Sequence, residues 1–123
     1  MACPDKYKEL GSFHRYWSGE KKAPRLTLFI GGNHEASNYL KELYYGGWVA
    51  PNIYFLGHSG VVDVKVGENK LTIAGISGIE KWHDFKKGLF EEAPFDEDEK
   101  RSIFHIRQYE TLKLQLYSRI ASR

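Results

Sequence analysis

The sequence predicts an α/β fold, because segments typical of strands and of helices alternate along its 123 residues. Residues 26–30 form an apolar run that ends in Gly31 and Gly32, and residues 35–43 then carry apolar side chains at helical spacing. In residues 61–66, valines alternate with charged residues, as in a half-buried strand. A strand that passes through a glycine turn into a helix places polar side chains at the carboxyl end of a sheet.

The composition is that of an ordinary globular protein, with 41% hydrophobic and 28% charged residues. The aromatic content of 15% is high, and such rings serve either in a core or as stacking surfaces for bases and sugars. A net charge of +2 does not by itself indicate nucleic acid. The single Cys3 cannot form an internal disulfide, which favours a reducing compartment. No apolar run approaches the roughly 18 residues of a membrane span, and no signal peptide is recognisable.

In the first half of the chain, residues 5–10 are expected to be a short helical or irregular piece. Residues 12–24 are expected to be a loop, which either lies on the solvated surface or faces a substrate. The strand at 26–30 has no charged position, which predicts burial on both of its faces. The helix at 35–43 is expected to stop at the glycine pair that follows it.

In the second half, residues 53–56 are expected to be another buried strand, and residues 61–66 and 71–76 a hairpin. Residues 79–97 show no consistent period. A connection of this length without regular structure is unusual in a compact domain and is often functional.

A final helix is expected to begin at Asp96, because Glu99 follows three residues later and the two form a capping-box pattern. The helix is expected to run to the end of the chain, where Arg119 and Arg123 suit its dipole. Its expected apolar stripe consists of Ile103, Ile106, Tyr109, Leu112, Leu116 and Ile120.

The polar triplet after the first strand is the main candidate for chemistry. The amide oxygen of Asn33 can join carboxylates and imidazoles around a divalent metal ion. The imidazole of His34 can protonate a leaving oxygen. Glu35 can orient that imidazole. The alternative is that Asn33 merely caps the following helix.

The motif Gly-Asn-His-Glu at 32–35 resembles the third motif of the calcineurin-like metallophosphoesterases. Longer segments narrow the resemblance to the RNA lariat debranching enzymes within that superfamily, and together they cover nearly the whole chain. These segments are residues 4–8, 11–24, 29–40, 46–54, 75–79 and 101–107.

The resemblance implies part of a calcineurin-like fold, a β-sandwich flanked by helices that is incomplete at both ends and occupies residues 1–123. It implies hydrolysis of the 2′–5′ phosphodiester at the branch point of excised intron lariats, with divalent iron, zinc or manganese as cofactor. Asn33 would be a metal ligand and His34 the catalytic residue at the phosphate. Glu35 would not touch the metal but would orient the imidazole of His34. The implied partner is branched intron RNA, with no membrane, and the implied location is the nucleus, with the cytoplasm as a second site.

Family members also carry a lariat recognition loop, which corresponds to residues 78–106 here. The candidate phosphate contacts are Lys81, Lys86, Lys87, His105 and Arg107, and the candidate stacking rings are Trp82, Phe85 and Phe90. The family usually has an aromatic residue where Glu80 stands and a histidine where Leu89 stands, so RNA contact is not expected from these two positions.

Several family motifs do not occur in this sequence. Glycine is never followed by aspartate, and neither an Asp-x-His nor a His-x-His pattern is found. A phosphoesterase centre needs several ligands in fixed geometry. We therefore expect an internal segment of the enzyme, from an incomplete gene model, that is inactive alone. The alternatives are a non-catalytic RNA- or protein-binding module and another metallophosphoesterase such as a protein phosphatase, which the long matches outside the triplet disfavour.

Overall fold

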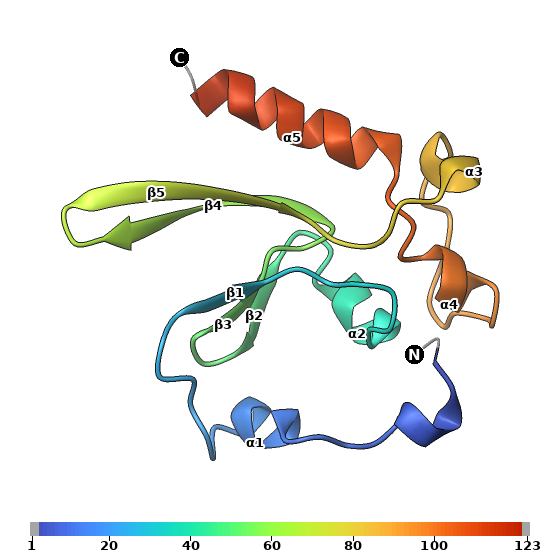
Figure 1. Ribbon diagram of the computed structural model, residues 1–123, viewed down its shortest axis with the longest axis horizontal. Coiled ribbons are helices and arrows are strands. Elements are labelled where there is room, and N and C mark those ends of the chain that lie inside the picture. Colours follow the sequence, from blue (N-terminus) through green and yellow to red (C-terminus); the bar gives the residue numbers. More distant parts are fainter. Residues whose placement is uncertain (1–2, 122–123) are drawn as a thin grey trace.

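The computed structural model describes residues 3–121, without the side chains of the last two, and contains two small sheets with short helices around them (Figure 1). The strands are β1 (Thr27–Phe29), β2 (Gly47–Ala50), β3 (Ile53–Phe55), β4 (Ser59–Val66) and β5 (Asn69–Ile76). The helices are η1 (Asp5–Tyr7), α1 (Phe13–Trp17), α2 (Ser37–Glu42), α3 (Trp82–Phe85), α4 (Glu99–Ser102) and α5 (Gln108–Ala121). None of the helices in this described part is long and apolar enough to cross a membrane. The α/β prediction is confirmed, with mixed rather than purely parallel strand pairing.

The first sheet has the strand order β1-β3-β2, with β1 parallel to β3 and β2 antiparallel to it. Phe55 on β3 is only 1% exposed and packs with Leu40 of α2 and Val49 of β2. The predicted burial of the first strand on both faces is wrong. Leu26 and Ile30, which flank β1, are 46% and 50% exposed, and no residue within β1 is fully buried. Strand β1 is also an edge strand, since only β3 pairs with it among the described residues.

The second sheet is the predicted hairpin, in which β4 and β5 pair from Ser59 with Ile76 to Val66 with Asn69. The turn is tighter than the sequence indicated, since Asn69 already belongs to β5. Gly67 lies in this turn with φ of 62°, a left-handed conformation that glycine adopts without strain. Beyond Ile76 the chain leaves the sheet and enters the aperiodic region.

The structure corrects two predictions, one of a loop and one of a helix. The expected loop at 12–24 contains the short helix α1. The expected helix from Asp96 to the end is broken, because α4 ends at Ser102 and α5 begins only at Gln108. Tertiary packing explains the break: the side chains of Ile103 and Phe104 turn into a second core with Phe95.

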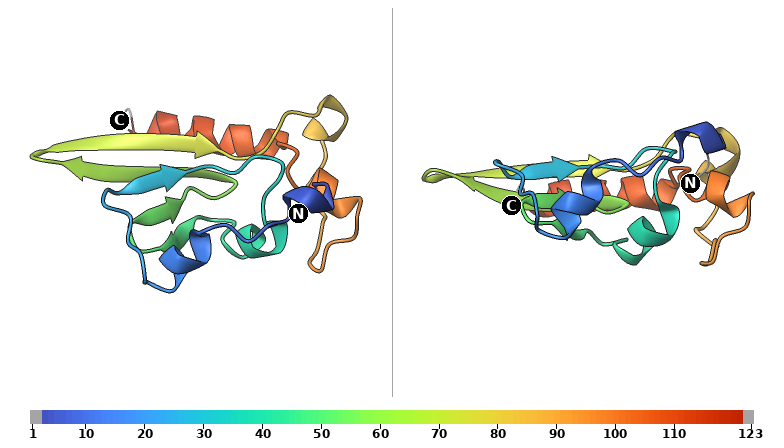
Figure 2. Two further views of the ribbon diagram at one scale, coloured as in Figure 1. Left: turned by 60° about the horizontal axis from the view of Figure 1, so that its bottom comes forward. Right: turned by 90° about the horizontal axis from the view of Figure 1, so that it is seen from below.

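Helix α5 lies along the hairpin and contacts β4 (Figures 1 and 2). Lys113 fixes this packing, because its Nζ donates a hydrogen bond of 2.9 Å to the carbonyl of Ser59. The predicted apolar stripe is nevertheless largely open, since Leu112 is 48% and Leu116 59% exposed. The side chain of Ile120, which the prediction included, and the whole of Arg123 lie outside the described residues.

Candidate functional site

The polar triplet lies in the loop that connects β1 to α2, at the carboxyl end of β1. Hydrogen bonds anchor this loop to the end of the hairpin: the Gly31 amide donates to Ser77 Oγ over 3.0 Å, and the Gly31 carbonyl accepts from the Gly78 amide over 2.8 Å. Ser77 Oγ in turn donates to the carbonyl of Gly57, two residues beyond the end of β3, over 2.6 Å. The loops that follow the two parallel strands are thus joined through one hydroxyl group.

Within the triplet, Asn33 and Glu35 are half-buried and His34 is exposed. The Glu35 carboxylate accepts a hydrogen bond of 2.9 Å from the Gly32 amide, which fixes the turn before the helix. Helix α2 has Ala36 at its N-cap and no capping side chain, so the alternative in which Asn33 merely caps the helix is wrong. An exposed imidazole on a fixed loop can meet a substrate, whereas the catalytic and metal roles of the triplet stay predictions.

The triplet does not make a metal centre by itself. Within residues 3–121, one group of three His, Cys, Asp or Glu side chains has ligand atoms close enough together to hold an ion. That group is His83, Asp84 and His105, and it includes neither His34 nor Glu35. A metal centre that used Asn33 would need ligands beyond those that the described chain brings to this loop.

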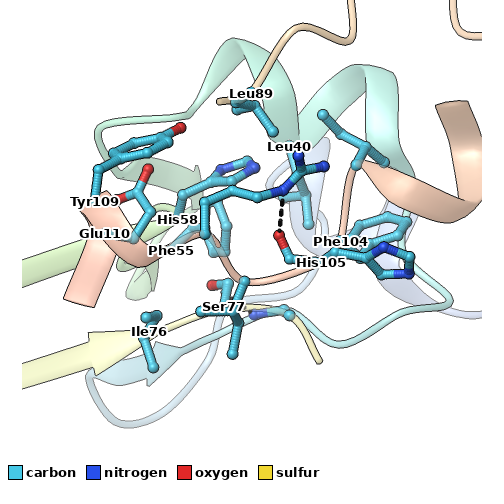
Figure 3. A pocket seen from close by; sticks show the side chains of 15 residues that line it. Leu40, Phe55, His58, Ile76, Ser77, Leu89, Phe104, His105, Tyr109 and Glu110 are labelled. Atoms are coloured by element: carbon cyan, nitrogen blue, oxygen red, sulfur yellow. Dashed lines mark hydrogen bonds between the residues drawn. The ribbon is translucent and has the colours of Figure 1, made fainter. Parts of the chain in front are cut away.

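Behind the triplet loop lies a pocket that Gly31, Ser77, residues 103–107, Tyr109 and Glu110 help to line (Figure 3). His105 and Phe104 lie at one end of the pocket, and Tyr109 and Glu110 lie at the other (Figure 3). Most of the lining residues are apolar. They come from the first sheet, the hairpin and the turn before α5, so the pocket lies where these elements meet.

A buried carboxyl group occupies the Glu110 end of this pocket. Tyr44 and Ser59 donate short hydrogen bonds from their hydroxyl groups to the two carboxyl oxygens of Glu110, and Lys113 Nζ lies 3.9 Å from one of them. Burial raises the pKa of Glu110 above its usual value. The network links the turn after α2 to β4 and α5. The sequence did not predict it, because its members are distant in the chain and Glu110 lies on a helix with an apolar stripe.

His58 lies against the same network, with its ring stacked on Tyr44 at a centroid distance of 4.6 Å. Its Nδ1 is buried and has no hydrogen-bond partner within the described structure. Burial, followed by the positive charges of Lys41, Lys113 and Arg107, lowers the pKa of His58 to about 4. This imidazole is therefore neutral at pH 7 and serves as a packed ring.

The predicted RNA contacts on and beside α3 lie on the surface. Lys81, Lys86 and Lys87 are exposed, and Trp82 is 85% exposed, while Phe85 is half-buried. Phe90, on the stretch that follows, is 82% exposed. Cationic and aromatic side chains on one short segment form the combination that binds phosphates and unstacked bases.

Two of the predicted phosphate contacts are instead internal. Arg107 is 3% exposed, and its guanidinium donates to the carbonyls of Gly88, Ser102 and His105 and to the Glu91 carboxylate, over 2.7 to 3.0 Å. The side chain of His105 is 11% exposed and bonds to Asp84. These internal hydrogen bonds disfavour a phosphate contact by either residue, because their donors already have partners inside the protein.

The mixed sheet and the polar loop at the end of its parallel strand define an α/β protein with a candidate site at the carboxyl edge. No protein-family model matches the sequence. Among curated proteins, the chain is 59% identical over 115 residues to the lariat debranching enzyme of Homo sapiens. The matched residues cover 94% of this chain and 20% of that protein.

Two other relatives give the same result. The chain is 58% identical over 118 residues to the lariat debranching enzyme of Drosophila melanogaster, covering 96% of this chain and 21% of the relative. It is 52% identical over 115 residues to that of Schizosaccharomyces pombe, covering 94% and 24%. The predicted resemblance to the lariat debranching enzymes is confirmed, and the chain spans between 20% and 24% of the length of these relatives.

Proposed function

We propose that this chain provides part of the active site and part of the RNA surface of a lariat debranching enzyme. The proposed reaction is the metal-dependent hydrolysis of the 2′–5′ phosphodiester in branched intron RNA, and the proposed location is the nucleus. One observation carries the proposal: identity of 52% to 59% over at least 94% of the chain to proteins named as lariat debranching enzymes. On this proposal, the mixed sheet and the hairpin are parts of a calcineurin-like sandwich.

In the proposed site, Asn33 gives its amide oxygen to a divalent iron, zinc or manganese ion, and His34 approaches the scissile phosphate. The half-buried position of Asn33 and the exposure of His34 support this division of roles. Glu35 keeps the loop in place through its bond to the Gly32 amide. The described residues do not complete the coordination of this ion, so on this proposal it needs further ligands.

The proposed RNA surface comprises the exposed residues of segment 78–106, the proposed recognition loop. Lys81 and Lys86 would bind phosphate oxygens, and Trp82 would stack on an unpaired base. Salt weakens such contacts, because each neutralised phosphate releases counterions.

A chimera tests the catalytic proposal. The matching segment of the human relative is replaced by this chain, and debranching of a synthetic branched RNA is measured with Mn²⁺ present. The chimera is expected to be active, and the 123-residue chain alone to show no measurable cleavage. In the chimera, His34→Ala is expected to lower kcat by about a hundredfold or more, because general acid catalysis typically contributes about 10²–10⁴-fold.

Matched variants serve as controls for the chimera. His14 and Asn38 are both exposed, so His14→Ala and Asn38→Ala are expected to retain full activity. A folded chimera in which His34→Ala and Asn33→Ala are as active as the parent would refute the proposed roles. Cleavage by the isolated chain would refute its proposed dependence on further ligands.

The exposed cationic and aromatic residues of α3 favour a second candidate, a non-catalytic RNA- or protein-binding module derived from the same enzyme. This candidate predicts that the isolated chain binds branched RNA more tightly than linear RNA of the same length. Affinity is measured for both RNAs across a range of salt concentration, with Lys81→Ala/Lys86→Ala as the variant. Equal affinities, or no binding, leave this candidate without support.

A further inference from the structure

Helix α3 carries a buried aspartate between two imidazoles. Asp84 is 6% exposed, and its Oδ2 lies 2.5 Å from Nδ1 of His105 and 3.6 Å from Nε2 of His83. The three potential ligand atoms lie within 4.8 Å of one another. The other carboxylate oxygen, Oδ1, accepts from Lys87 Nζ over 2.7 Å.

We propose that His83, Asp84 and His105 bind one divalent transition-metal ion through Nε2, Oδ2 and Nδ1, respectively. The site is separate from the Asn33 loop and does not depend on the proposed function. Two imidazoles and one carboxylate suit zinc and its neighbours in the first transition series, whereas magnesium and calcium prefer oxygen ligands.

The spacing of the ligand atoms fits such an ion. Zinc bonds of about 2.0–2.2 Å in tetrahedral geometry place neighbouring ligand atoms about 3.3–3.5 Å apart. The separation of 3.6 Å between His83 and Asp84 already matches this value. A hydrogen bond of 2.5 Å joins Nδ1 of His105 to Oδ2 of Asp84. A bound ion would displace the shared proton into solvent, and Nδ1 and Oδ2 would move apart by about 1 Å.

The surroundings prepare the site for a cation. Hydrogen bonds from Lys87 and then His105 hold the pKa of Asp84 well below its usual range, so the carboxylate is ionised at neutral pH. The side chains of Asp84 and His105 are 8% and 11% exposed and are fixed by packing, whereas that of His83 is 49% exposed. An ion can therefore enter from the His83 side, and three protein ligands leave a coordination position for water.

Lys87 opposes the ion by its charge but does not block it. Its side chain is 61% exposed and bonds to Oδ1, so it leaves Oδ2 to the metal and can turn into solvent. The bound ion would link α3, which carries His83 and Asp84, to His105 in the turn before α5. It would add to the isolated parallel bridge between Ile79 and His105, which already joins the two ends of segment 78–106.

Calorimetric titration of the purified 123-residue chain with Zn²⁺ tests the proposal. One ion per chain is expected, and His83→Ala is expected to weaken the affinity at least tenfold. This variant is preferred because the side chain is half exposed, so its removal leaves the packing of α3 intact, which far-UV circular dichroism checks. Lys87→Met is expected to tighten binding severalfold, because it removes a competing positive charge.

Two further measurements separate this site from others. Co²⁺ is expected to give the visible absorption bands of a low-symmetry site with nitrogen and oxygen ligands in the parent chain, and to lose them in His83→Ala. His14→Ala and the double variant Asn33→Ala/His34→Ala are expected to bind Zn²⁺ as the parent does. Binding that His83→Ala leaves unchanged, binding that only the Asn33 and His34 changes abolish, or no binding by the parent would overturn the proposal.

Discussion

At the scale of single residues, burial separates side chains that the sequence presents as equivalent. Lys81 and Arg107 both lie in or beside the proposed recognition loop, yet Lys81 is exposed and Arg107 is buried. The buried guanidinium joins three carbonyls and the Glu91 carboxylate, whose side chain is 10% exposed. Arg107 therefore holds together the turn before α5.

Replacing Arg107 is expected to destabilise the protein strongly. Arg107→Met removes these hydrogen bonds and leaves the Glu91 carboxylate buried without its cation, which typically costs about 3–5 kcal/mol. Urea unfolding followed by tryptophan fluorescence measures the change. Arg101→Met, at an exposed position, is the control and is expected to change stability by less than about 0.5 kcal/mol. Equal effects of the two changes would contradict the role of Arg107.

His58 is expected to make stability depend on pH. The unfolded chain binds a proton on this imidazole below its ordinary pKa of 6.5, whereas the folded protein binds it only below about 4. The contribution of His58 is therefore fully present above pH 6.5 and is lost as the pH falls towards 4. At about 1.4 kcal/mol per pKa unit, the loss is on the order of 3 kcal/mol.

The matched variant for this prediction is His58→Phe, which keeps a ring against Tyr44 but does not titrate. Glu110, whose pKa is raised, makes stability change with pH in the opposite direction. Because both the parent and His58→Phe contain Glu110, its effect cancels when the two proteins are compared. The difference in unfolding free energy between the parent and His58→Phe is expected to move against the parent as the pH falls from 7 to 4.5. A difference that does not change with pH contradicts the prediction.

At the scale of elements, local signals predicted where α4 begins but not where it ends. The capping box is present: the Glu99 amide donates to Asp96 Oδ1 over 2.8 Å, and the Asp96 amide donates to Glu99 Oε2 over 3.0 Å. These bonds depend only on neighbours in the chain. The end of α4 depends on packing, because Ile103 and Phe104, which follow its last residue, join Phe95 in the second core.

Removing the cap is expected to weaken α4 modestly. Asp96→Ala removes Oδ1, which accepts hydrogen bonds from both the Glu99 amide and, over 2.9 Å, the Asp98 amide. The expected cost is about 1 kcal/mol, measured by urea unfolding. Asp98→Ala is the matched control, because Asp98 makes no side-chain capping bond. A larger effect of Asp98→Ala than of Asp96→Ala would show that the cap is assigned to the wrong residue.

At the scale of the whole molecule, the chain leaves apolar surface open on α5 and beside β1. Leu112, Leu116 and Tyr117 are 48%, 59% and 46% exposed, and β1 is an unprotected edge within the described sheet. Exposed apolar faces and free strand edges promote association. We therefore expect the isolated chain to aggregate as its concentration rises.

Charged residues on α5 are expected to reduce this association. Leu112→Lys/Leu116→Lys interrupts the open face and raises the net charge, so the monomer fraction in sedimentation velocity is expected to increase. Gln108→Lys/Gln115→Lys adds the same charge at exposed polar positions and is the control. A soluble parent monomer with a sharp cooperative thermal transition, or equal gains in the two variants, would contradict the assignment of association to the apolar face.

The sequence by itself determined the features that depend on near neighbours. Alternation predicted the β4-β5 hairpin, spacing predicted α2, and the Asp96 and Glu99 pair predicted a helix start. It also placed Asn33 and His34 in a loop after a strand, and its long matches predicted the resemblance to lariat debranching enzymes.

The tertiary structure alone decided which side chains are buried and which distant ones meet. It buried Arg107, opened the α5 stripe, and gathered His83, Asp84 and His105 from segments separated in the chain. The physical reason is that periodicity reports only which side chains share a face of an element. What that face packs against depends on the other elements, so a polar triplet can be found in the sequence while a three-residue cluster around Asp84 cannot.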